Sequence, residues 1–304
     1  MDVVIVNWNS RELLRECLRA LDRSTNAGEL NVVVIDNASS DGSAEDLAAE
    51  RLRIAVVGND ENRGFAAACN QGAGRGGAPL VLFLNPDVRL KPDALDKVCR
   101  YLAEPANSGV GILGVQLLDA QGRISRSCAR TPTPAAILLR SMFLDRICPA
   151  LVSPHFLQEW NHRDTRPVDQ VMGACLVIRR STWQQLKGFD ERFFLYYEDV
   201  DLCLAARQAG WSVMHFAGAQ AEHTGQGTTQ AIKVRRTLYE ARSRIEYVAK
   251  RHGRAWACLV GLFILLFELP VRGLYATTML SPREGWNALR AAGFFSRSCA
   301  KYLR

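Results

Sequence analysis

The sequence predicts an α/β fold in which helices flank a doubly wound, mostly parallel sheet. Three observations predict it. Short, continuously apolar runs recur along the first part of the chain, which is typical of strands covered on both faces. Segments with helical periodicity alternate with these runs, as in right-handed crossovers between parallel strands. Polar residues follow the runs, at the edge where open α/β sheets bind ligands.

The composition describes a globular protein with room for one large core and an appendage. Of the 304 residues, 48% are hydrophobic and 23% are charged. The nine cysteines include no C-x-x-C pair and no cluster at zinc spacing, so we expect reduced thiols and no disulfides. The chain opens on an apolar strand without the basic start of a signal peptide, so we expect it in the cytoplasm.

The net charge of +7 is concentrated at the C-terminal end, since residues 232–304 hold 14 Lys/Arg and 4 Asp/Glu. We therefore predict a domain over 1–231, with halves at about 1–118 and 168–231, and a basic, apolar helical extension over 232–304. A near-neutral body with a basic tail predicts no nucleic-acid partner and favours an anionic membrane surface.

The first two units each run strand, polar turn, helix. Residues 3–6 read as a short buried strand, and Asn-Trp-Asn-Ser leads into a helix over 11–21 with leucines on one face. Residues 31–37 read as a second strand. The Ser- and Asp-rich turn that follows leads into an expected Ala- and Glu-rich helix after residue 43.

The fourth strand is the most informative. A third strand over 54–57, a turn at 62–65 and a helix from 66 precede it. Residues 80–84 then form a buried run that stops at Asn85-Pro86-Asp87, because Pro86 cannot continue a strand ladder. A carboxylate at this edge can bind a divalent cation together with a diphosphate that the cation carries.

The middle of the chain predicts further elements and one irregular stretch. A helix is expected over 92–102, a strand pair over 109–118 and a last strand over 211–216. Residues 131–166 lose periodicity and carry four prolines, so we expect an irregular connection that could close over a ligand. In 168–179, Gly173-Ala174 permits close approach of another chain or a substrate.

Three carboxylates, Glu198, Asp199 and Asp201, fall near the start of a helix expected to begin near Val200. In one interpretation these acids have a structural role alone, since acids in a first helical turn stabilise the helix dipole and cap free N–H groups. The aromatic residues before them favour the alternative, a general base with a raised pKa. His223 follows a strand and precedes a Gly-rich turn, where a neutral imidazole could complete a metal site.

The chain lacks the sequence motifs of several other classes of ligand-binding and catalytic site. The chain has no G-x-G-x-x-G after the first strand and no phosphate-binding G-x-x-x-x-G-K-[ST] loop, so polar side chains must handle the ligand. It also has no G-x-S-x-G turn that would present a serine nucleophile.

The ordered set of motifs over roughly residues 2–230 resembles the family 2 inverting glycosyltransferases of the GT-A fold. The motifs are Ile5-Val-Asn-Trp-Asn9, Val34-Ile-Asp-Asn-Ala-Ser-Ser-Asp41, Asn62-Arg-Gly-Phe65 with Asn70, Asn85-Pro-Asp87, Gly173-Ala174, Tyr197-Glu-Asp-Val-Asp-Leu202 and His223. Within that family the chain is most similar to bacterial rhamnosyltransferases that act on lipid-linked acceptors.

The resemblance implies a role for each matching position. It implies that Asp36 and Asn37 hold the nucleobase and ribose, with Asn7 and Asn9 nearby, and that Arg63 and Asn70 face the nucleotide and its phosphates. Asn85-Pro86-Asp87 stands in the place of a D-x-D motif, so Asn85 and Asp87 would contact the nucleotide sugar, and Asp87 and His223 would bind Mg²⁺ or Mn²⁺. Asp199 would be the catalytic base, and Glu198 would help orient the acceptor.

The resemblance also implies an activity. We expect transfer of a sugar, most specifically L-rhamnose from dTDP-L-rhamnose, to a lipid-linked saccharide in cell-surface polysaccharide synthesis. The alternative is a GT-A-like protein that binds nucleotide or scaffolds a complex without turnover. The presence of Asp87, Asp199 and His223 favours the enzyme.

The tail combines a basic helix over 232–254 with an uncharged run over 255–267. Thirteen residues are fewer than the roughly 20 that cross a bilayer as a helix. We therefore expect a helix in the membrane interface, peripheral on the inner face of the cytoplasmic membrane, with a homodimer contact as the alternative.

Overall fold

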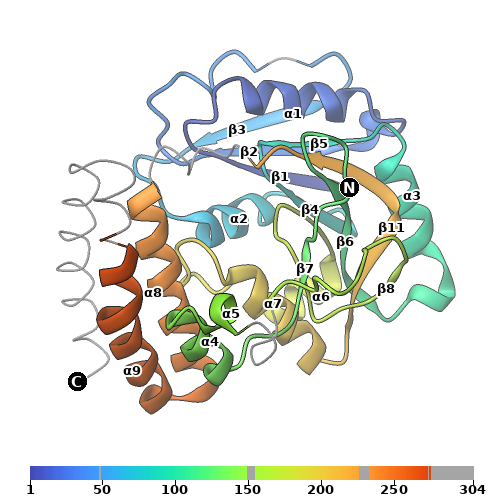
Figure 1. Cartoon of the computed structure of the whole chain (residues 1–304). Coiled ribbons are helices and arrows are strands. Elements are labelled where there is room, and N and C mark those ends of the chain that lie inside the picture. Colours follow the sequence, from blue (N-terminus) through green and yellow to red (C-terminus); the bar gives the residue numbers. More distant parts are fainter. Residues whose placement is uncertain (48, 149–154, 226–232, 273, 275–304) are drawn as a thin grey trace. The chain divides into compact units, whose positions relative to one another are not determined.

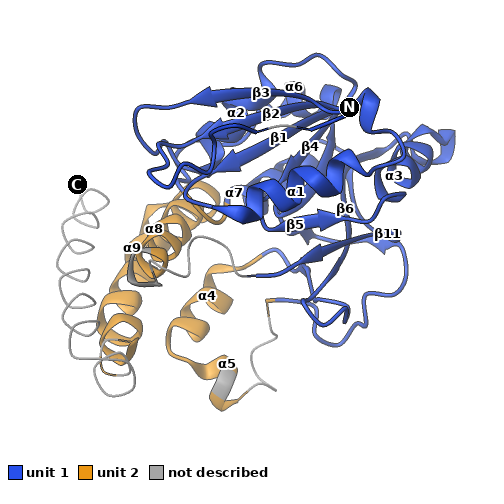
Figure 2. Cartoon of the chain, turned by 90° about the horizontal axis from the view of Figure 1, so that it is seen from above, with its two compact units in different colours: residues 1–131, 156–194, 198–228 blue, residues 132–155, 195–197, 229–304 orange. Residues whose placement is uncertain are grey.

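The computed structural model describes residues 1–47, 49–148, 155–225, 233–272 and 274 (Figure 1). The chain divides into two compact units (Figure 2). Unit 1 comprises residues 1–131, 156–194 and 198–228, and unit 2 comprises 132–155, 195–197 and 229–304. Unit 2 thus contains two internal segments besides the C-terminal region. The predicted division into a catalytic domain over 1–231 and an extension over 232–304 concerns function and stays a prediction.

Unit 1 is built on a large sheet. Its strands are β1 (Asp2–Asn7), β2 (Asn31–Asp36), β3 (Arg53–Gly58), β4 (Leu80–Leu84), β5 (Val88–Leu90), β6 (Val110–Leu118), β8 (Arg166–Pro167), β10 (Cys175–Arg179) and β11 (Ser212–His223). The strand order is β3-β2-β1-β4-β10-β6-β11-β5, and β8 pairs with β11. A second, two-stranded sheet joins β7 (Cys128–Ala129) to β9 (Gln170–Val171).

The predicted parallel character is confirmed. The ladders β1–β2, β2–β3 and β1–β4 are parallel, and so is β6–β11. Strand β10 runs antiparallel to both β4 and β6, which gives β6 the same direction as β4. The expected strand pair over 109–118 is wrong: all nine residues of β6 are buried in one continuous strand.

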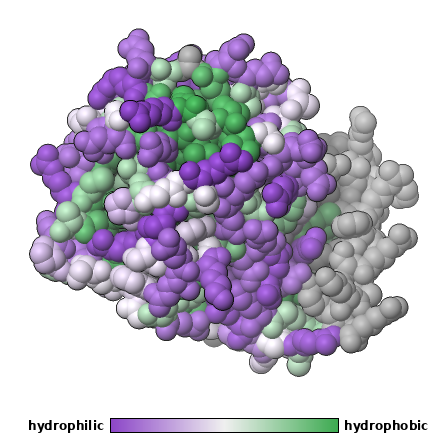
Figure 3. Space-filling model, turned by 180° about the vertical axis from the view of Figure 1, so that it is seen from behind, coloured by the Kyte–Doolittle hydropathy of each residue, from purple (hydrophilic) through white to green (hydrophobic). Residues whose placement is uncertain are grey.

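Helices cover both faces of this sheet, as expected for a doubly wound fold. They are α1 (Glu12–Asp22), α2 (Phe65–Ala73), α3 (Ala94–Ala103), α6 (Arg180–Leu186) and α7 (Glu198–Gln208), with 3-10 turns at Ala27–Glu29 and Pro105–Asn107. One buried apolar cluster contains residues of α1 and α3, and the other contains residues of α2, α6 and α7. The surface in Figure 3 is mostly hydrophilic, with apolar patches between polar groups.

Two helix predictions in unit 1 are wrong. No helix occurs between β2 and β3 in the described residues, which omit residue 48. Side chains stabilise turns there instead, since Ser43 N–H donates to Asp41 Oδ1 at 3.0 Å. Helix α7 is present but begins at Glu198 rather than near Val200, so Asp199 lies inside its first turn.

Unit 2 is helical. Its elements are α4 (Pro134–Ser141), α5 (Leu144–Ile147), α8 (Lys233–His252), α9 (Arg254–Phe263) and a π-helical turn, η4 (Ile264–Glu268). The prediction of an irregular connection over 131–166 misses α4 and α5. Thr133 caps α4 by accepting from Ala136 N–H at 3.2 Å, and Pro134 occupies the first turn, where proline is tolerated.

The C-terminal helices match the predicted basic helix and apolar run, with one difference. Helical structure continues from Arg254 to Arg272, and this 19-residue segment reaches a mean hydropathy of 1.8. By length and composition alone it could cross a membrane, a test that core helices of soluble proteins also pass. The eight cysteines in the described residues are all free thiols, as predicted, and Cys299 lies outside them.

Candidate active site

The ends of β1 and β2 form a polar cluster around Asn7, which is fully buried. Asn7 Nδ2 donates to Asp36 Oδ1 at 2.7 Å, to Ser43 Oγ at 2.9 Å and to Ser39 Oγ at 3.1 Å. Ser10 Oγ donates to Asn7 Oδ1. These bonds use the Asn7 amide within the protein, so the structure gives Asn7 the role of holding Asp36 and the loop after β2.

Asn9 and Asp36 both organise that loop. Asn9 Oδ1 accepts from Ser40 N–H at 2.8 Å, and Ser39 Oγ accepts from Asn9 N–H at 2.9 Å. Ser39 N–H donates to Asp36 Oδ2 at 3.1 Å, and Asp36 remains half-buried at the end of β2. The predicted nucleotide residues Asn7, Asn9 and Asp36 are therefore brought together.

Asn37 connects this cluster to the start of α2. Asn37 Nδ2 donates to the carbonyl of Gly64 at 3.1 Å, and Asn37 Oδ1 accepts from Asn59 Nδ2 at 2.9 Å. Gly64 has φ of 86°, and a Cβ placed on it would lie 2.6 Å from the carbonyl oxygen of Phe194. Phe65 N–H donates to that same oxygen at 2.7 Å, which links α2 to the segment before Glu198.

Arg63 and Asn70 differ in what surrounds them. Arg63 is exposed beside the N-terminus of α2, and its role toward phosphates stays a prediction. Asn70 is already bonded: its Nδ2 donates to Phe189 O and to Glu191 Oε1, both at 2.9 Å, and its Oδ1 accepts from Phe189 N–H at 2.9 Å. Asn70 thus joins α2 to the loop after α6.

Asp87 and His223 come together at the edge of the sheet. His223 Nε2 lies 3.4 Å from Asp87 Oδ2, and the two side chains are 19% and 6% exposed, respectively. Thr224 N–H donates to the carbonyl of Asp87 at 3.3 Å, which fixes the chain after β11 against the Asn-Pro-Asp turn. The two predicted metal residues are therefore neighbours.

The pair fits a divalent cation. A separation of 3.4 Å is less than twice the roughly 2.1 Å between Mg²⁺ and its ligands, so one ion can contact both atoms. A carboxylate oxygen and an imidazole nitrogen suit Mn²⁺ as well. No group of three His, Cys, Asp or Glu capable of holding a metal occurs in the described residues. Further ligands would therefore come from the diphosphate and water, as is usual for Mg²⁺.

Glu198 and Asp199 form a carboxylate pair in a mostly buried place. Glu198 is 5% exposed, and its Oε2 has no hydrogen-bond partner in the described residues. Burial raises the pKa of Glu198 well above its usual range, and the neighbouring Asp199 raises it further. Burial also raises the pKa of Asp199, although hydrogen bonds to its carboxylate oppose the rise.

Two backbone N–H groups orient Asp199. Gly173 N–H donates to Asp199 Oδ2 at 2.9 Å, and Val200 N–H donates to Oδ1 at 2.8 Å. The next residue, Ala174, accepts from Asn85 N–H at 2.9 Å. The Gly173-Ala174 segment therefore places the candidate base beside the turn that carries Asp87. The Asn85 side chain, predicted to bind the nucleotide sugar, is half-buried in that turn.

The structure adds residues that the sequence did not indicate. Gln170 on β9 is 6% exposed, and its side chain hydrogen-bonds to Asp199, while its Oε1 has no partner in the described residues. Tyr196 and Tyr197 each have φ of 68°, an uncommon conformation for a residue with a side chain. The positive φ values turn the chain sharply just before Glu198; an aromatic run before an acidic pair is the only sequence signal for this turn.

Comparison with known proteins finds similar sequences and similar folds. An N-acetylglucosaminyl-diphospho-decaprenol L-rhamnosyltransferase of Mycobacterium tuberculosis is 27% identical over 271 residues, covering 84% of this chain and 86% of the relative. The crystal structure of S. aureus TarS 1-349 has a TM-score of 0.54 at 16% identity, covering 98% and 80% of the two chains. A mannosyltransferase of Pyrobaculum calidifontis, in complex with GDP-Man and Mn²⁺, has a TM-score of 0.53 at 17% identity, covering 100% and 80%.

The structural likenesses confirm the predicted GT-A fold, and the rhamnosyltransferase relative agrees with the resemblance seen in the motifs. A family model described as glycosyltransferase like family 2 matches residues 1–256, which is most of the chain. The protein therefore belongs to the glycosyltransferase like family 2 and is a glycosyltransferase.

Proposed function

We propose that the protein is an inverting rhamnosyltransferase that moves L-rhamnose from dTDP-L-rhamnose to a lipid-linked saccharide in cell-surface polysaccharide synthesis. The Mycobacterium tuberculosis relative supports the transferred sugar and the kind of acceptor, because its name specifies an L-rhamnosyl transfer and a diphospho-decaprenol acceptor.

The observation that carries the proposal is the placement of Asp199. An inverting transfer needs one base that removes the proton of the acceptor hydroxyl as that oxygen attacks the sugar. Asp199 is half-buried, its pKa is raised by burial, and the N–H groups of Gly173 and Val200 fix its orientation. Glu198 Oε2, which is buried and has no partner among the residues that the structure describes, could accept a hydrogen bond from an acceptor hydroxyl beside it.

The donor half of the reaction belongs to the ends of β1, β2 and β4. Asp36 and Asn37 would bind the nucleoside, and exposed Arg63 would approach the diphosphate. Asp87 and His223 would hold Mg²⁺ or Mn²⁺, which neutralises the charge that develops on the leaving diphosphate.

The acceptor implies where the enzyme works. A lipid-linked saccharide remains in a bilayer, so we propose that the enzyme acts on the cytoplasmic face of the membrane, with an anionic surface as a partner. The excess of Lys/Arg in the C-terminal region supports this location. A homodimer contact through the C-terminal helices is the alternative to this membrane contact, and light scattering tests it.

A donor panel tests the proposal. Each reaction contains the enzyme, N-acetylglucosaminyl-diphospho-polyprenol as acceptor and one donor. The donors are dTDP-L-rhamnose, UDP-glucose, UDP-N-acetylglucosamine and GDP-mannose. We expect turnover with dTDP-L-rhamnose and an inverted anomeric configuration by NMR. Turnover of UDP-hexoses but not of dTDP-L-rhamnose would remove the donor assignment, and retained configuration would remove the base mechanism.

A further inference from the structure

Helix α9 and the turns after it expose apolar side chains. Trp256, Leu259, Leu262, Leu266, Phe267 and Val271, here called the outer face, are each at least a third exposed, with Leu262 at 48% and Leu266 at 56%. Apart from the adjacent Leu266 and Phe267, they recur at intervals of three or four residues, so they lie along one side of the helical segment. Exposed positions on a helix of a soluble protein normally carry polar groups, so this face points to an apolar partner.

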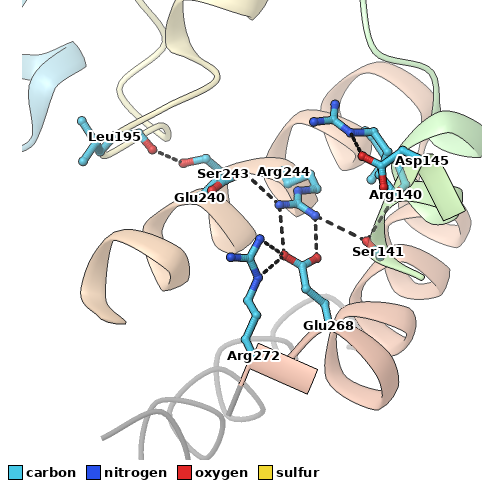
Figure 4. A network of polar contacts seen from close by, with 10 residues as sticks. Arg140, Ser141, Asp145, Leu195, Glu240, Ser243, Arg244, Glu268 and Arg272 are labelled. Carbon is cyan, nitrogen blue, oxygen red and sulfur yellow. Dashed lines mark hydrogen bonds and ion pairs between the residues drawn. The ribbon is translucent and has the colours of Figure 1, made fainter. Parts of the chain in front are cut away.

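The opposite side of the same helical segment carries its only buried charge. Ala257, Val260 and Ile264 are buried, and Glu268 is 2% exposed. Glu268 Oε2 accepts from Arg244 Nη1 of α8 at 2.7 Å, and Arg244 also bonds Glu240 at 3.0 Å (Figure 4). The polar group thus faces the protein and the apolar groups face outward.

The packing of α8 excludes a spanning arrangement for α9. Helix α8 packs along α9 and carries Glu240, Arg242, Arg244, Glu246 and Lys250 within one stretch. A helix that crossed the bilayer at α9 would carry these charges into the hydrocarbon, where each ionised group costs at least about 2.5 kcal/mol. If only the outer-face side chains of α9 enter the bilayer, the charged residues of α8 stay in water.

The charges of unit 2 favour an anionic surface. Its described segments 132–148, 195–197 and 233–272 hold eleven Lys/Arg and four Asp/Glu. All four acids are neutralised or buried. Glu246 and Glu268 are buried, Glu240 pairs with Arg244, and Asp145 pairs with Arg140 at 3.8 Å. Cations therefore outnumber acids in the described residues of unit 2, and Arg242 of α8 is exposed.

We infer that the outer face of α9 inserts into the interface of an anionic lipid bilayer, with the helix lying parallel to the membrane plane. The inference deepens the membrane location proposed above and does not depend on which sugar is transferred. Apolar side chains enter the boundary between headgroups and acyl chains, and the neighbouring Lys/Arg side chains contact anionic headgroups.

Vesicle sedimentation with the full-length protein tests this surface without any substrate. The variant Leu262→Asp/Leu266→Asp places two charges on the outer face. Val56→Asp is the matched control, because Val56 is 46% exposed on β3 in unit 1. The vesicles contain phosphatidylcholine alone or an equimolar mixture with phosphatidylglycerol.

We expect wild type and Val56→Asp to bind the mixed vesicles at least tenfold more tightly than phosphatidylcholine vesicles. The double variant should bind mixed vesicles at least tenfold more weakly than wild type. Alkaline carbonate should release the bound wild type, since an interfacial helix is extractable. Equal binding by the double variant would overturn the inference, and so would retention after carbonate, which indicates a spanning helix.

Two further measurements address other occupants of the outer face. If a second copy covers it, the wild type is a dimer by light scattering and the double variant is a monomer. If the chain's own residues after 274 cover it, the double variant has a much lower Tm than Val56→Asp. Either result overturns the inference, whereas a monomer with an unchanged Tm supports it. If the wild-type protein binds vesicles as expected but transfers no sugar, that result counts against the proposed function and not against this inference.

Discussion

His223 Nε2 faces Asp87 Oδ2 at 3.4 Å because the two residues lie at paired strand ends. Strand β5 begins directly after Asp87, and β11 ends at His223 opposite Val88 in an antiparallel ladder. Two residues far apart in the sequence thus become a pair through strand register alone.

This pair predicts metal-dependent donor binding. We expect Asp87→Ala to abolish turnover and to remove the gain in donor affinity that Mg²⁺ or Mn²⁺ gives the wild type, since a hard oxygen ligand is lost. Calorimetry with dTDP-L-rhamnose, with and without EDTA, measures this gain. Asp93→Ala, which removes a half-buried acid paired with Lys97, is the control. Wild-type kinetics in Asp87→Ala would remove the metal assignment.

The base assignment predicts different effects for neighbouring acids. Asp199→Asn keeps the shape but cannot accept a proton, so kcat should fall about 10²-fold or more with donor affinity unchanged. Asp201→Asn alters a residue inside the first turn of α7, so we expect it to cost about 1 kcal/mol of stability with little loss of kcat. Normal turnover in Asp199→Asn together with an inactive Glu198→Gln would transfer the role to Glu198.

Burial of Glu198 predicts a pH-dependent gain in stability for Glu198→Gln. The native pKa is raised, so between the unfolded value of about 4.3 and the native value the folded protein binds more protons than the unfolded chain. The stability contribution of Glu198 therefore falls as pH rises through this window. Since glutamine does not ionise, the Tm advantage of Glu198→Gln should grow with pH and then level off above the native pKa.

Calorimetry from about pH 4 to about pH 9 checks this dependence. Glu61→Gln, an exposed carboxyl, should show no comparable growth. A Tm difference that shrinks as pH rises would contradict the assignment of burial as the cause.

Gln170 predicts a shift in the acid limb of the pH profile. Its hydrogen bond stabilises the ionised Asp199 and lowers a pKa that burial raises, so Gln170→Leu should raise that pKa further. The acid limb of kcat/KM should move to higher pH. Gln116→Leu is the control: this equally buried glutamine donates to His162 O at 2.7 Å and should lose stability without moving the limb. Identical profiles in both variants would give Gln170 a structural role only.

Gly64 predicts a local steric requirement. A methyl group there meets Phe194 O at 2.6 Å, whereas Gly122, with a similar φ of 74°, has nothing within 4 Å. Both alanine variants carry backbone strain, and Gly64→Ala adds a clash worth roughly 1–3 kcal/mol. Urea unfolding should therefore show a larger loss for Gly64→Ala. Equal losses would mean that the α2 start moves freely away from Phe194.

The sequence by itself predicted most of the parallel sheet, because buried strands read as continuous apolar runs and polar residues follow them. The runs over 3–6, 31–37, 54–57 and 80–84 became β1 to β4. The sequence also indicated Asp87 and His223, because each follows an apolar strand at the edge where open α/β sheets bind ligands, and their metal role stays a prediction.

Local patterns misled where side chains compete with the backbone or where helices are short. The described residues of the Ala- and Glu-rich stretch after Ser43 form turns and bends, and the Asp41 side chain bonds the Ser43 N–H just before them. The proline-rich stretch after 131 contains α4, since Thr133 and Pro134 start that helix instead of breaking it.

The carboxylate pair needed the tertiary structure. Whether Glu198 and Asp199 are dipole partners or a base depends on burial and on donors from elsewhere in the chain. Gly173 and Gln170 reach Asp199 only because β9 and β10 place them there. In the same way the sequence determined that residues 255–267 are apolar and uncharged, but only packing against α8 and α4 decided which side of α9 is buried and which is exposed. Hydrophobic pattern is a local property, whereas desolvation and hydrogen-bond partners depend on residues that folding brings from distant parts of the chain.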